Sequence, residues 1–436
     1  MLVFLHIFAP MISEETYSRI SALLHAEVKP ALGCTEPIAV AIAVARAVAV
    51  WPQSRPESVK VLVSPNILKN AMGVGIPGTG QTGLPIAIAL AVVCGHHEYG
   101  LEVLKDATPK AVQAAKTYVS EGRITVGVAK TDRMLYASAE CFFAGGHRSS
   151  AAIRDAHDAI VFVSRDDEVL LDVAPCETSA EGGENGRFLS LPLILEFAQT
   201  AREPDLALMK EQLRLNSALA DAGLKNGYGL SVGRTLADDP SFGEDLTTMC
   251  MAYTAAASDA RMSGCMLPAM SNSGSGNQGI TASLPVIAAA RTLASSEEEL
   301  LRALVASNLV AIHIKSYLGK LSALCGCVVA STGASCGIIM LKGGTVEQMG
   351  FAIKNMIGCI TGMVCDGAKE GCAMKVASGV SCALQSAVLA MKGICVRPTD
   401  GIVDEDVEKT IRNLGEIGSN GMRQTDSLIL DIMVCK

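Results

Sequence analysis

The stretch from Arg123 to Val173, RITVGVAKTDRMLYASAECFFAGGHRSSAAIRDAHDAIVFVSRDDEVLLDV, decides the fold class. Short runs rich in Val, Ile and aromatic residues occur at Ile124–Val128, Leu135–Phe143 and Ile160–Val173. They are separated by Gly and Asp, which is typical of short strands joined by turns. We therefore expect a small β-rich subdomain at residues 123–187.

The residues on the N-terminal side of this stretch predict a mixed α/β segment at 13–122. Ser13 is a typical N-cap, and Pro37 occupies the first turn of an Ala-rich helix that Glu36 opens. A strand is expected at Ser58–Val63. Further helices are expected at Ser13–Val28, Leu84–Val93 and Thr108–Glu121.

The residues on the C-terminal side predict a helical domain at 188–436, which follows a polar, Gly-rich loop at Glu177–Arg187. The expected fold class is therefore α+β, with a predominantly helical C-terminal half and a mixed N-terminal half that contains the small β-rich subdomain. Glycine-rich breaks between helices are expected at Ser271–Gly279, Gly333–Gly337 and Gly362–Gly371.

Composition excludes several classes of protein. The chain has 436 residues, a net charge of −8 and only 18% charged positions, too few for a disordered chain. It has no basic run, so we expect no nucleic-acid partner. No stretch reaches the roughly 18 uncharged apolar residues of a membrane span. The apolar segment Met1–Ile12 lacks a basic start and a cleavage site, so we expect an N-terminal extension and a cytoplasmic protein.

Fifteen cysteines stand out in a chain without a credible secretory signal. A reducing compartment makes a disulfide framework unexpected, and most of these cysteines read as small core residues. Eight of them, however, lie between Cys325 and Cys395. Their spacing fits neither a zinc module nor a ferredoxin run, so a metal or iron–sulfur site there would draw its ligands from separate elements.

The motif Gly33-Cys34-Thr35-Glu36-Pro37 places a cysteine directly before a helix. The helix dipole and free N–H groups there favour a thiolate, which suits a nucleophile, a base or a metal ligand. A cysteine packed in a tight turn is the alternative.

Two polar loops are candidates for binding an anion. The glycine-rich loop Gly73–Gly83 lacks a phosphate-binding Lys and does not enter a helix at once, which disfavours nucleotides. Its N–H groups can still bind a carboxylate, with Asn66, Lys69 and Asn70 as additional donors. The second loop precedes an apolar segment, and its small donors are Ser271, Asn272, Ser273, Gly274, Gly276 and Asn277.

Arg261 lies upstream of the second loop, in Ser258-Asp259-Ala260-Arg261. It can clamp a carboxylate, but we favour a structural pair with Asp259. Three further cysteines stand in short motifs: Cys325 ends S-A-L-C, Cys365 starts C-D-G-A and Cys372 starts C-A-M-K. Three thiolates around an open fourth position suit a [4Fe–4S] cluster, and three unrelated core cysteines are the alternative.

These motifs make the chain resemble the L-cysteine desulfidase family, which is related to the α part of iron–sulfur L-serine dehydratases. The resemblance runs from about His25 to Asp431. It implies that Cys325, Cys365 and Cys372 hold a [4Fe–4S] cluster and that Cys34 takes part in catalysis. The motifs that carry it are E-V-K-P-A-L-G-C-T-E-P at 27–37, S-P-N-I-L-K-N at 64–70, G-L-E-V-L-K-D-A-T at 100–108, A-A-S-D-A-R-M at 256–262, P-A-M-S-N-S-G-S-G-N-Q-G-I-T-A at 268–282, and the three cysteine motifs.

The resemblance implies an activity: L-cysteine and water give pyruvate, ammonia and hydrogen sulfide without pyridoxal phosphate. The substrate is thus a small amino acid. Cys34 is either the base that removes the α-proton or a fourth cluster ligand that substrate displaces. An L-serine ammonia-lyase with the same cluster is the nearer alternative, and an iron–sulfur or thiol redox sensor is the more distant one. A homodimer is the default expectation.

Overall fold

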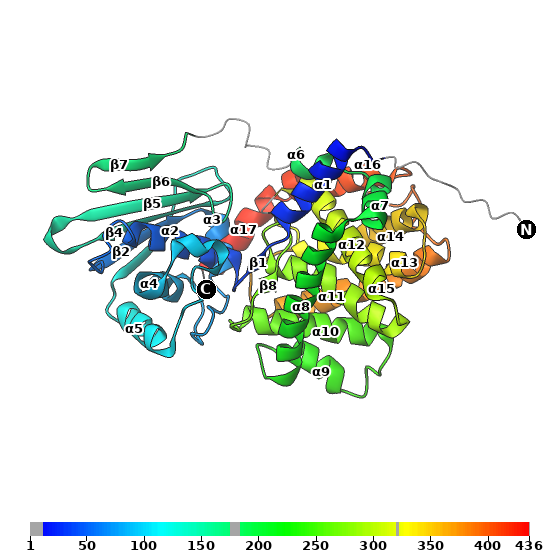
Figure 1. Cartoon of the computed structure of the whole chain (residues 1–436), viewed down its shortest axis with the longest axis horizontal. Coiled ribbons are helices and arrows are strands. Elements are labelled where there is room, and N and C mark those ends of the chain that lie inside the picture. The colour runs from blue at the N-terminus through cyan, green and yellow to red at the C-terminus, as the bar shows by residue number, and fades with distance from the viewer. Residues whose placement is uncertain (1–11, 175–183, 320–321, 436) are drawn as a thin grey trace, which may run out of the picture.

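The structure is a computed structural model that describes residues 12–174, 184–319 and 322–435. It has two lobes side by side, a sheet lobe and a helical lobe (Figure 1). The expected α+β fold is confirmed, with a mixed N-terminal half and a helical C-terminal half. The apolar segment before Ile12 lies outside the described residues, as does most of the loop predicted at Glu177–Arg187, which ends in helix α6 (Glu184–Arg187).

The sheet lobe contains one six-stranded sheet with strand order β3-β2-β4-β5-β6-β7. Strands β2 and β3 are parallel and the other pairs are antiparallel. The parallel pair requires a crossover, which helices α3, α4 and α5 provide. The strands are β2 (Ser58–Val63), β3 (Ile124–Val128), β4 (Tyr136–Phe142), β5 (Arg148–Arg154), β6 (Ile160–Arg165) and β7 (Glu168–Asp172).

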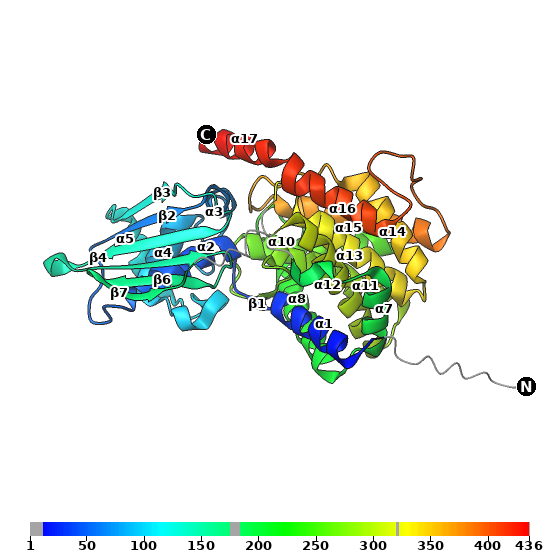
Figure 2. The same ribbon diagram turned by 90° about the horizontal axis from the view of Figure 1, so that it is seen from above.

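Helices cover one face of this sheet (Figures 1 and 2). Burial alternates along β2 and β4, because successive side chains point to opposite faces. Helix α2 packs on β4 and β5 and is almost entirely buried, as its Ala- and Val-rich sequence allows. The helices of this lobe are α2 (Thr35–Val48), α3 (Pro65–Ala71), α4 (Leu84–Cys94) and α5 (Pro109–Ser120).

The helical lobe begins with the N-terminal helix α1 (Glu14–Glu27), whose N-cap Ser13 accepts a hydrogen bond from the Thr16 amide, as predicted. A two-stranded sheet of β1 (Pro30–Ala31) and β8 (Ala269–Met270) joins its exit to the second polar loop. The other helices are α7 (Leu191–Thr200), α8 (Glu203–Lys225), α9 (Val232–Asp238), α10 (Leu246–Met262), α11 (Gly276–Leu293), α12 (Glu297–Leu318), α13 (Gly326–Leu341), α14 (Val346–Ile360), α15 (Cys372–Met391), α16 (Val407–Glu416) and α17 (Arg423–Val434).

The domain boundaries predicted from the sequence stay a prediction. The six-stranded sheet extends across the predicted boundary between residues 122 and 123, since β2 pairs with both β3 and β4. Helix α1, although it precedes the sheet lobe in sequence, belongs to the hydrophobic core of the helical lobe through Ile20 and Leu24. The buried hydroxyl of Tyr17 also donates to Asp205 of α8, at 2.6 Å.

The predicted break at Gly333–Gly337 is wrong, because both glycines lie inside α13. A Cβ at Gly333 would clash with the backbone oxygen of Ser307 on α12, and one at Gly337 would lie 3.0 Å from the oxygen of Ala303. These glycines therefore allow two helices to approach closely rather than ending one. The predicted segments at Ser271–Gly279 and Gly362–Gly371 do interrupt the helices, the first as far as the start of α11 at Gly276.

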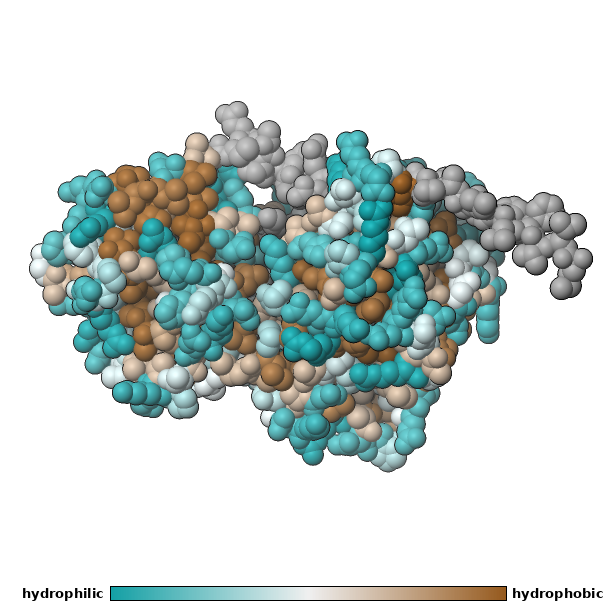
Figure 3. All heavy atoms as spheres, in the orientation of Figure 1, coloured by the Kyte–Doolittle hydropathy of each residue, from teal (hydrophilic) through white to brown (hydrophobic). Residues whose placement is uncertain are grey.

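Helix α15 is, within the described residues, the one helix long and apolar enough to cross a membrane by length and composition. It packs against α10, α13 and α14, and 56% of its most apolar window is buried inside the protein. Such burial is typical of a core helix. The apolar side chains that do reach the surface include a group on the edge strand β7 and just after it, Val169, Leu170, Leu171 and Val173, where Figure 3 shows a brown patch.

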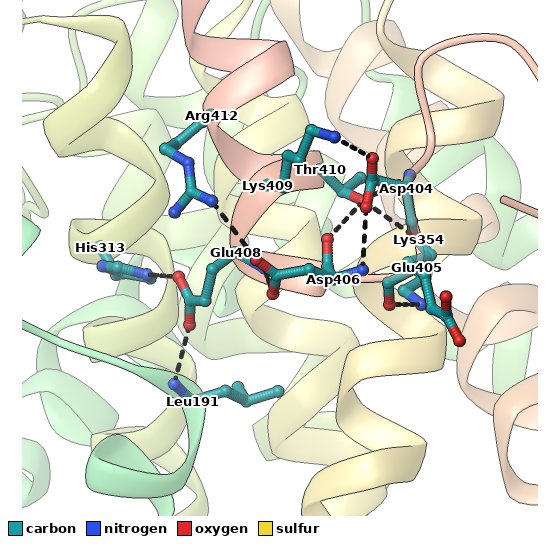
Figure 4. A network of polar contacts seen from close by, with 10 residues as sticks. All are labelled: Leu191, His313, Lys354, Asp404, Glu405, Asp406, Glu408, Lys409, Thr410 and Arg412. Atoms are coloured by element: carbon teal, nitrogen blue, oxygen red, sulfur yellow. Dashed lines mark hydrogen bonds and ion pairs between the residues drawn. The ribbon is translucent and has the colours of Figure 1, made fainter.

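Helix α16 is attached to the helical lobe by polar contacts (Figure 4). The Glu408 carboxylate contacts Nε2 of buried His313 at 2.7 Å and accepts from the Leu191 amide at 3.2 Å. Lys354 donates to the carbonyl of Glu405 at 2.5 Å, just before the helix. These contacts fix the C-terminal part of the chain, from which α17 extends toward the sheet lobe (Figure 2).

Candidate active site between the lobes

The G-C-T-E-P segment and the second polar loop lie side by side. Strands β1 and β8 bring them together, and both the amide and the hydroxyl of Ser271 donate to the carbonyl of Lys29, at 2.8 and 2.7 Å. The amide of Ser273 donates to the carbonyl of Glu27 at 3.0 Å. Two motifs about 240 residues apart thus form one structural unit, as a shared site requires.

The guanidinium group of Arg261 connects these two segments by hydrogen bonds. Its guanidinium donates to the carbonyl of Gly33 at 2.9 Å and to Oδ1 of Asn277 at 3.1 Å. The predicted pair with Asp259 is wrong, because that carboxylate faces the other way and accepts from the amide of Gly233 at 2.9 Å. Arg261 is only 4% exposed, and its Nε has no hydrogen-bond partner.

The glycines of the second loop serve its close packing. A Cβ at Gly276 would clash with the guanidinium of Arg261. Gly274 has a φ of +77°, and its carbonyl accepts from the Thr35 hydroxyl at 2.8 Å. Asn272 is fully buried, and its side chain bonds Asn308 and Gln278. The side chains predicted to bind substrate here are therefore largely engaged with the protein itself.

Cys34 is the N-cap residue of α2 and is 2% exposed. It packs with Val74 and Met262, and Cys372 lies against the same cluster. The expected thiolate is wrong for this environment: burial raises the pKa of Cys34 to about 12, although the Arg261 guanidinium opposes the shift. Desolvation outweighs the helix N-terminus here.

The predicted cluster ligands are held by two adjoining loops. Leu324 and Val364 form an antiparallel bridge. Around it, the amide of Cys325 donates to the carbonyl of Met363 at 3.0 Å, and the amide of Cys365 donates to the carbonyl of Ala323 at 2.7 Å. Cys372 starts α15, close to Cys34.

Burial raises the pKa of Cys365 and of Cys372, and the neighbouring thiol of Cys325 raises both further, as Cys365 does for Cys372. The pKa of Cys325 shifts the other way: it falls to about 7, because the thiol of Cys327 donates a hydrogen bond to it. The two sulfurs are 3.2 Å apart. Cys327 has no role in the sequence prediction, so the structure adds a fourth thiol to this group, and this one is buried while the other three are partly buried.

These residues fit an iron–sulfur cluster by the chemistry of the donor set. Among the described residues, no group of three or more His, Cys, Asp or Glu side chains is arranged to hold a single metal ion. A four-iron cluster spreads its thiolate ligands more widely than one ion does, and three or four converging thiols are the ligands it takes. The ammonium group of Lys375, which also pairs with Asp366, lies near enough to oppose the rise in the pKa of Cys365 and Cys372.

Lys315 is another residue that the sequence prediction missed. It lies on α12 near Cys325, Cys365 and Glu36, and burial lowers the pKa of its ammonium group. Its only sequence signal is a lysine in an otherwise apolar helical run, which many surface helices also show.

Asn66, Lys69 and Asn70 lie on helix α3, which approaches the Cys365 segment through Lys69, and the first two are not open to a ligand. Nδ2 of Asn66 donates to Asp426 of α17 at 2.7 Å, and buried Lys69 pairs with the same carboxylate. Lys69 also approaches the carbonyl of Cys365 at 3.5 Å. The carboxylate that Asn66 and Lys69 bind is therefore that of Asp426 in the C-terminal helix, whereas the sequence predicted that they would bind the substrate.

The glycine-rich loop Gly73–Gly83 packs against the end of α10. Its backbone N–H groups donate hydrogen bonds to other backbone carbonyls of the protein. The amide of Gly75 donates to the carbonyl of Met262 at 2.8 Å, and a Cβ at Gly75 would lie 2.5 Å from the carbonyl carbon of Ser263. The amide of Gly83 donates back to Val74 at 3.1 Å. The glycines here allow close packing on the end of α10, and this overturns the expected anion cradle.

Comparison with known proteins identifies the family of the chain. Residues 98–431 match the family described as serine dehydratase alpha chain. The chain belongs to this family. Its relatives include UPF0597 proteins of Phocaeicola vulgatus (50% identical, covering 98% of this chain and 99% of the relative), Oleidesulfovibrio alaskensis (49%, 96% and 98%) and Porphyromonas gingivalis (47%, 97% and 99%). Membership of the serine dehydratase alpha chain family indicates a lyase.

Proposed function

We propose that this chain is a [4Fe–4S]-dependent, pyridoxal-phosphate-independent lyase that converts L-cysteine and water to pyruvate, ammonia and hydrogen sulfide in the cytoplasm. The observation that carries the proposal is the convergence of Cys325, Cys365 and Cys372 beside Cys34, from segments up to about 340 residues apart in the chain. These three cysteines would hold the cluster, which when bound supplies a Lewis-acidic iron.

The reaction is an α,β-elimination. The substrate loses its α-proton, the Cβ–S bond breaks and the sulfur leaves with the electron pair. The resulting aminoacrylate becomes an imine, which water hydrolyses to pyruvate and ammonia. Cys34, beside the proposed cluster ligands, is the candidate base for the α-proton, and the Arg261 guanidinium would have to offset the burial that raises the pKa of its thiol to about 12. A displaceable fourth ligand is its other proposed role.

The test is anaerobic purification followed by iron, sulfide and pyruvate measurements. We expect about four irons per chain, and sulfide and pyruvate from L-cysteine. Serine variants of Cys325, Cys365 and Cys372 should lose both iron and activity. The matched control is Cys336→Ser, a buried cysteine of α13 outside the site, which should keep both. An iron-free, folded wild-type protein made with full cluster supply would refute the proposal.

L-Serine is the second candidate substrate, and the match to serine dehydratase alpha chain favours it specifically. The cluster ligands would be unchanged and a hydroxyl would replace the thiol as leaving group. Comparing kcat/KM for pyruvate formation from L-serine and L-cysteine decides between them. A redox sensor would bind the cluster but neither amino acid. Whether the chain forms the expected homodimer is decided by light scattering on the same sample.

A further inference from the structure

The most unusual polar group near the cysteines is the side-chain oxygen of Gln278, in the first turn of α11. Gln278 is 1% exposed, and its Oε1 is buried without a hydrogen-bond partner. Leaving a buried carbonyl unpaired costs free energy, so native proteins rarely keep one without a reason. A Cβ at Gly326, between Cys325 and Cys327, would lie 3.0 Å from this oxygen. Oε1 is therefore aimed at the start of α13, where the cysteines converge.

A chain of buried amides fixes this orientation. Nδ2 of Asn308 donates to the backbone oxygen of Leu304 at 2.8 Å, so Oδ1 of Asn308 must be an acceptor. It accepts from Nδ2 of Asn272 at 2.9 Å, which leaves Oδ1 of Asn272 to accept from Nε2 of Gln278, also at 2.9 Å. Turning the Gln278 amide over would place two acceptor oxygens against each other.

Several cationic side chains lie in this region, and the buried acceptors without a hydrogen-bond partner include Oε1 of Gln278 and Oδ1 of Asn70 on α3. Arg261, Lys315 and Lys375 can attract the carboxylate of an amino acid. The α-ammonium group needs an acceptor, and the carboxylate of Glu36, which already accepts from Thr35, is the competing choice. We propose that Oε1 of Gln278 accepts a hydrogen bond from the α-ammonium group of the substrate. The inference rests on the proposed function, because it assumes an amino-acid substrate bound beside the cysteines.

The test compares two unreactive ligands that differ only in the amine: α-methyl-L-cysteine and 3-mercapto-2-methylpropionate. Their affinities are measured by anaerobic titration of the cluster-loaded protein. Wild type should bind the amine about 10- to 100-fold more tightly, the range expected for a hydrogen bond to a charged group. In Gln278→Met this ratio should fall toward one while the affinity for the amine-free acid stays the same. A merely structural role would weaken both ligands equally.

The matched control is Thr281→Val, which removes another buried, unpartnered oxygen from the same helix and should keep the ratio. If Gln278→Met does not fold, Gln278→Ala replaces it, and this variant should lose the preference for the same reason, because it removes the same oxygen. An unchanged ratio in Gln278→Met, or its loss in Glu36→Gln instead, overturns the assignment and leaves the lyase proposal intact. Failure of wild type to bind either ligand overturns both.

Discussion

Cys325 and Cys34 both stand at the start of a helix, yet their surroundings give their thiols opposite tendencies to ionise. Cys325 accepts a hydrogen bond from Cys327, which lowers the pKa of its thiol to about 7. Cys34 is buried, and this burial raises the pKa of its thiol to about 12 although the Arg261 guanidinium opposes the shift. The helix N-terminus alone therefore does not decide which thiol is reactive.

This difference predicts the order of alkylation in cluster-free protein. With iodoacetamide at pH 7.5, Cys325 should react more than about 100-fold faster than Cys34, because the thiolate is the nucleophile. The Cys325 rate should rise with a midpoint near pH 7, and Cys327→Ala should move this midpoint upward. Peptide mapping by mass spectrometry measures both rates. Equal rates at the two cysteines would contradict the assigned environments.

Asp259 predicts a pH dependence of stability. Its pKa is raised to about 6, mainly by burial, so the folded chain holds its proton where the unfolded chain, at about 3.8, releases it. The free energy of unfolding should therefore fall as pH rises from 4 to 6, by up to about 3 kcal/mol from this group. Asp259→Asn should be more stable than wild type at pH 7 and equal to it below pH 4. Urea unfolding measures this, and parallel pH profiles would count against it.

At the scale of the element, the glycines of α13 set how closely two helices pack. Gly333→Ala places a methyl group against the backbone oxygen of Ser307 on α12, which cannot move without shifting the helix. We expect a loss of about 1–3 kcal/mol in the free energy of unfolding. Gly362→Ala is the control, since a Cβ there meets no atom within 4 Å. Two variants of equal stability would show that the helices can separate without cost.

In the polar loop before α11, the side chains predicted to bind substrate are bonded to the protein instead. Its donors were predicted to bind substrate, but Ser271 and Asn272 instead hold the loop against β1 and the helical core. The acceptor proposed for the substrate is the unpartnered oxygen of Gln278, in the first turn of α11. The loop donors are thus used for structure, and the proposed contact with the substrate lies in the helix that follows.

At the scale of the whole molecule, α17 links the two lobes. Asp426 near its start binds Asn66 and Lys69 of α3. Lys69 is only 2% exposed, so Asp426→Asn leaves a buried ammonium group without its carboxylate. We expect a loss of about 3 kcal/mol in the free energy of unfolding and faster proteolysis of α17. Asp431→Asn, an exposed position on the same helix, should change neither property. A stable Asp426→Asn variant would mean that Lys69 finds another partner.

Much of the secondary structure was predictable because it depends on local sequence patterns, such as capping residues and alternating hydrophobicity. Ser13 capped α1 as expected, and the alternating pattern placed β2 at Ser58–Val63. The short cysteine motifs likewise marked Cys325, Cys365 and Cys372, which the structure brings together. The role of Gly333 was not predictable, since a glycine that ends a helix and one that admits a neighbouring helix look alike in sequence.

The sequence by itself determined the α+β class, the positions of most helices and strands, and the residue types that suit an iron–sulfur lyase. The tertiary structure decided which of those residues are free to act. In the folded chain Lys69 forms an ion pair with Asp426, and burial raises the pKa of the Cys34 thiol. The fold also brings Cys327 and Lys315 to the site. The physical reason is that desolvation and hydrogen-bond partners depend on segments hundreds of residues apart, which no local pattern records.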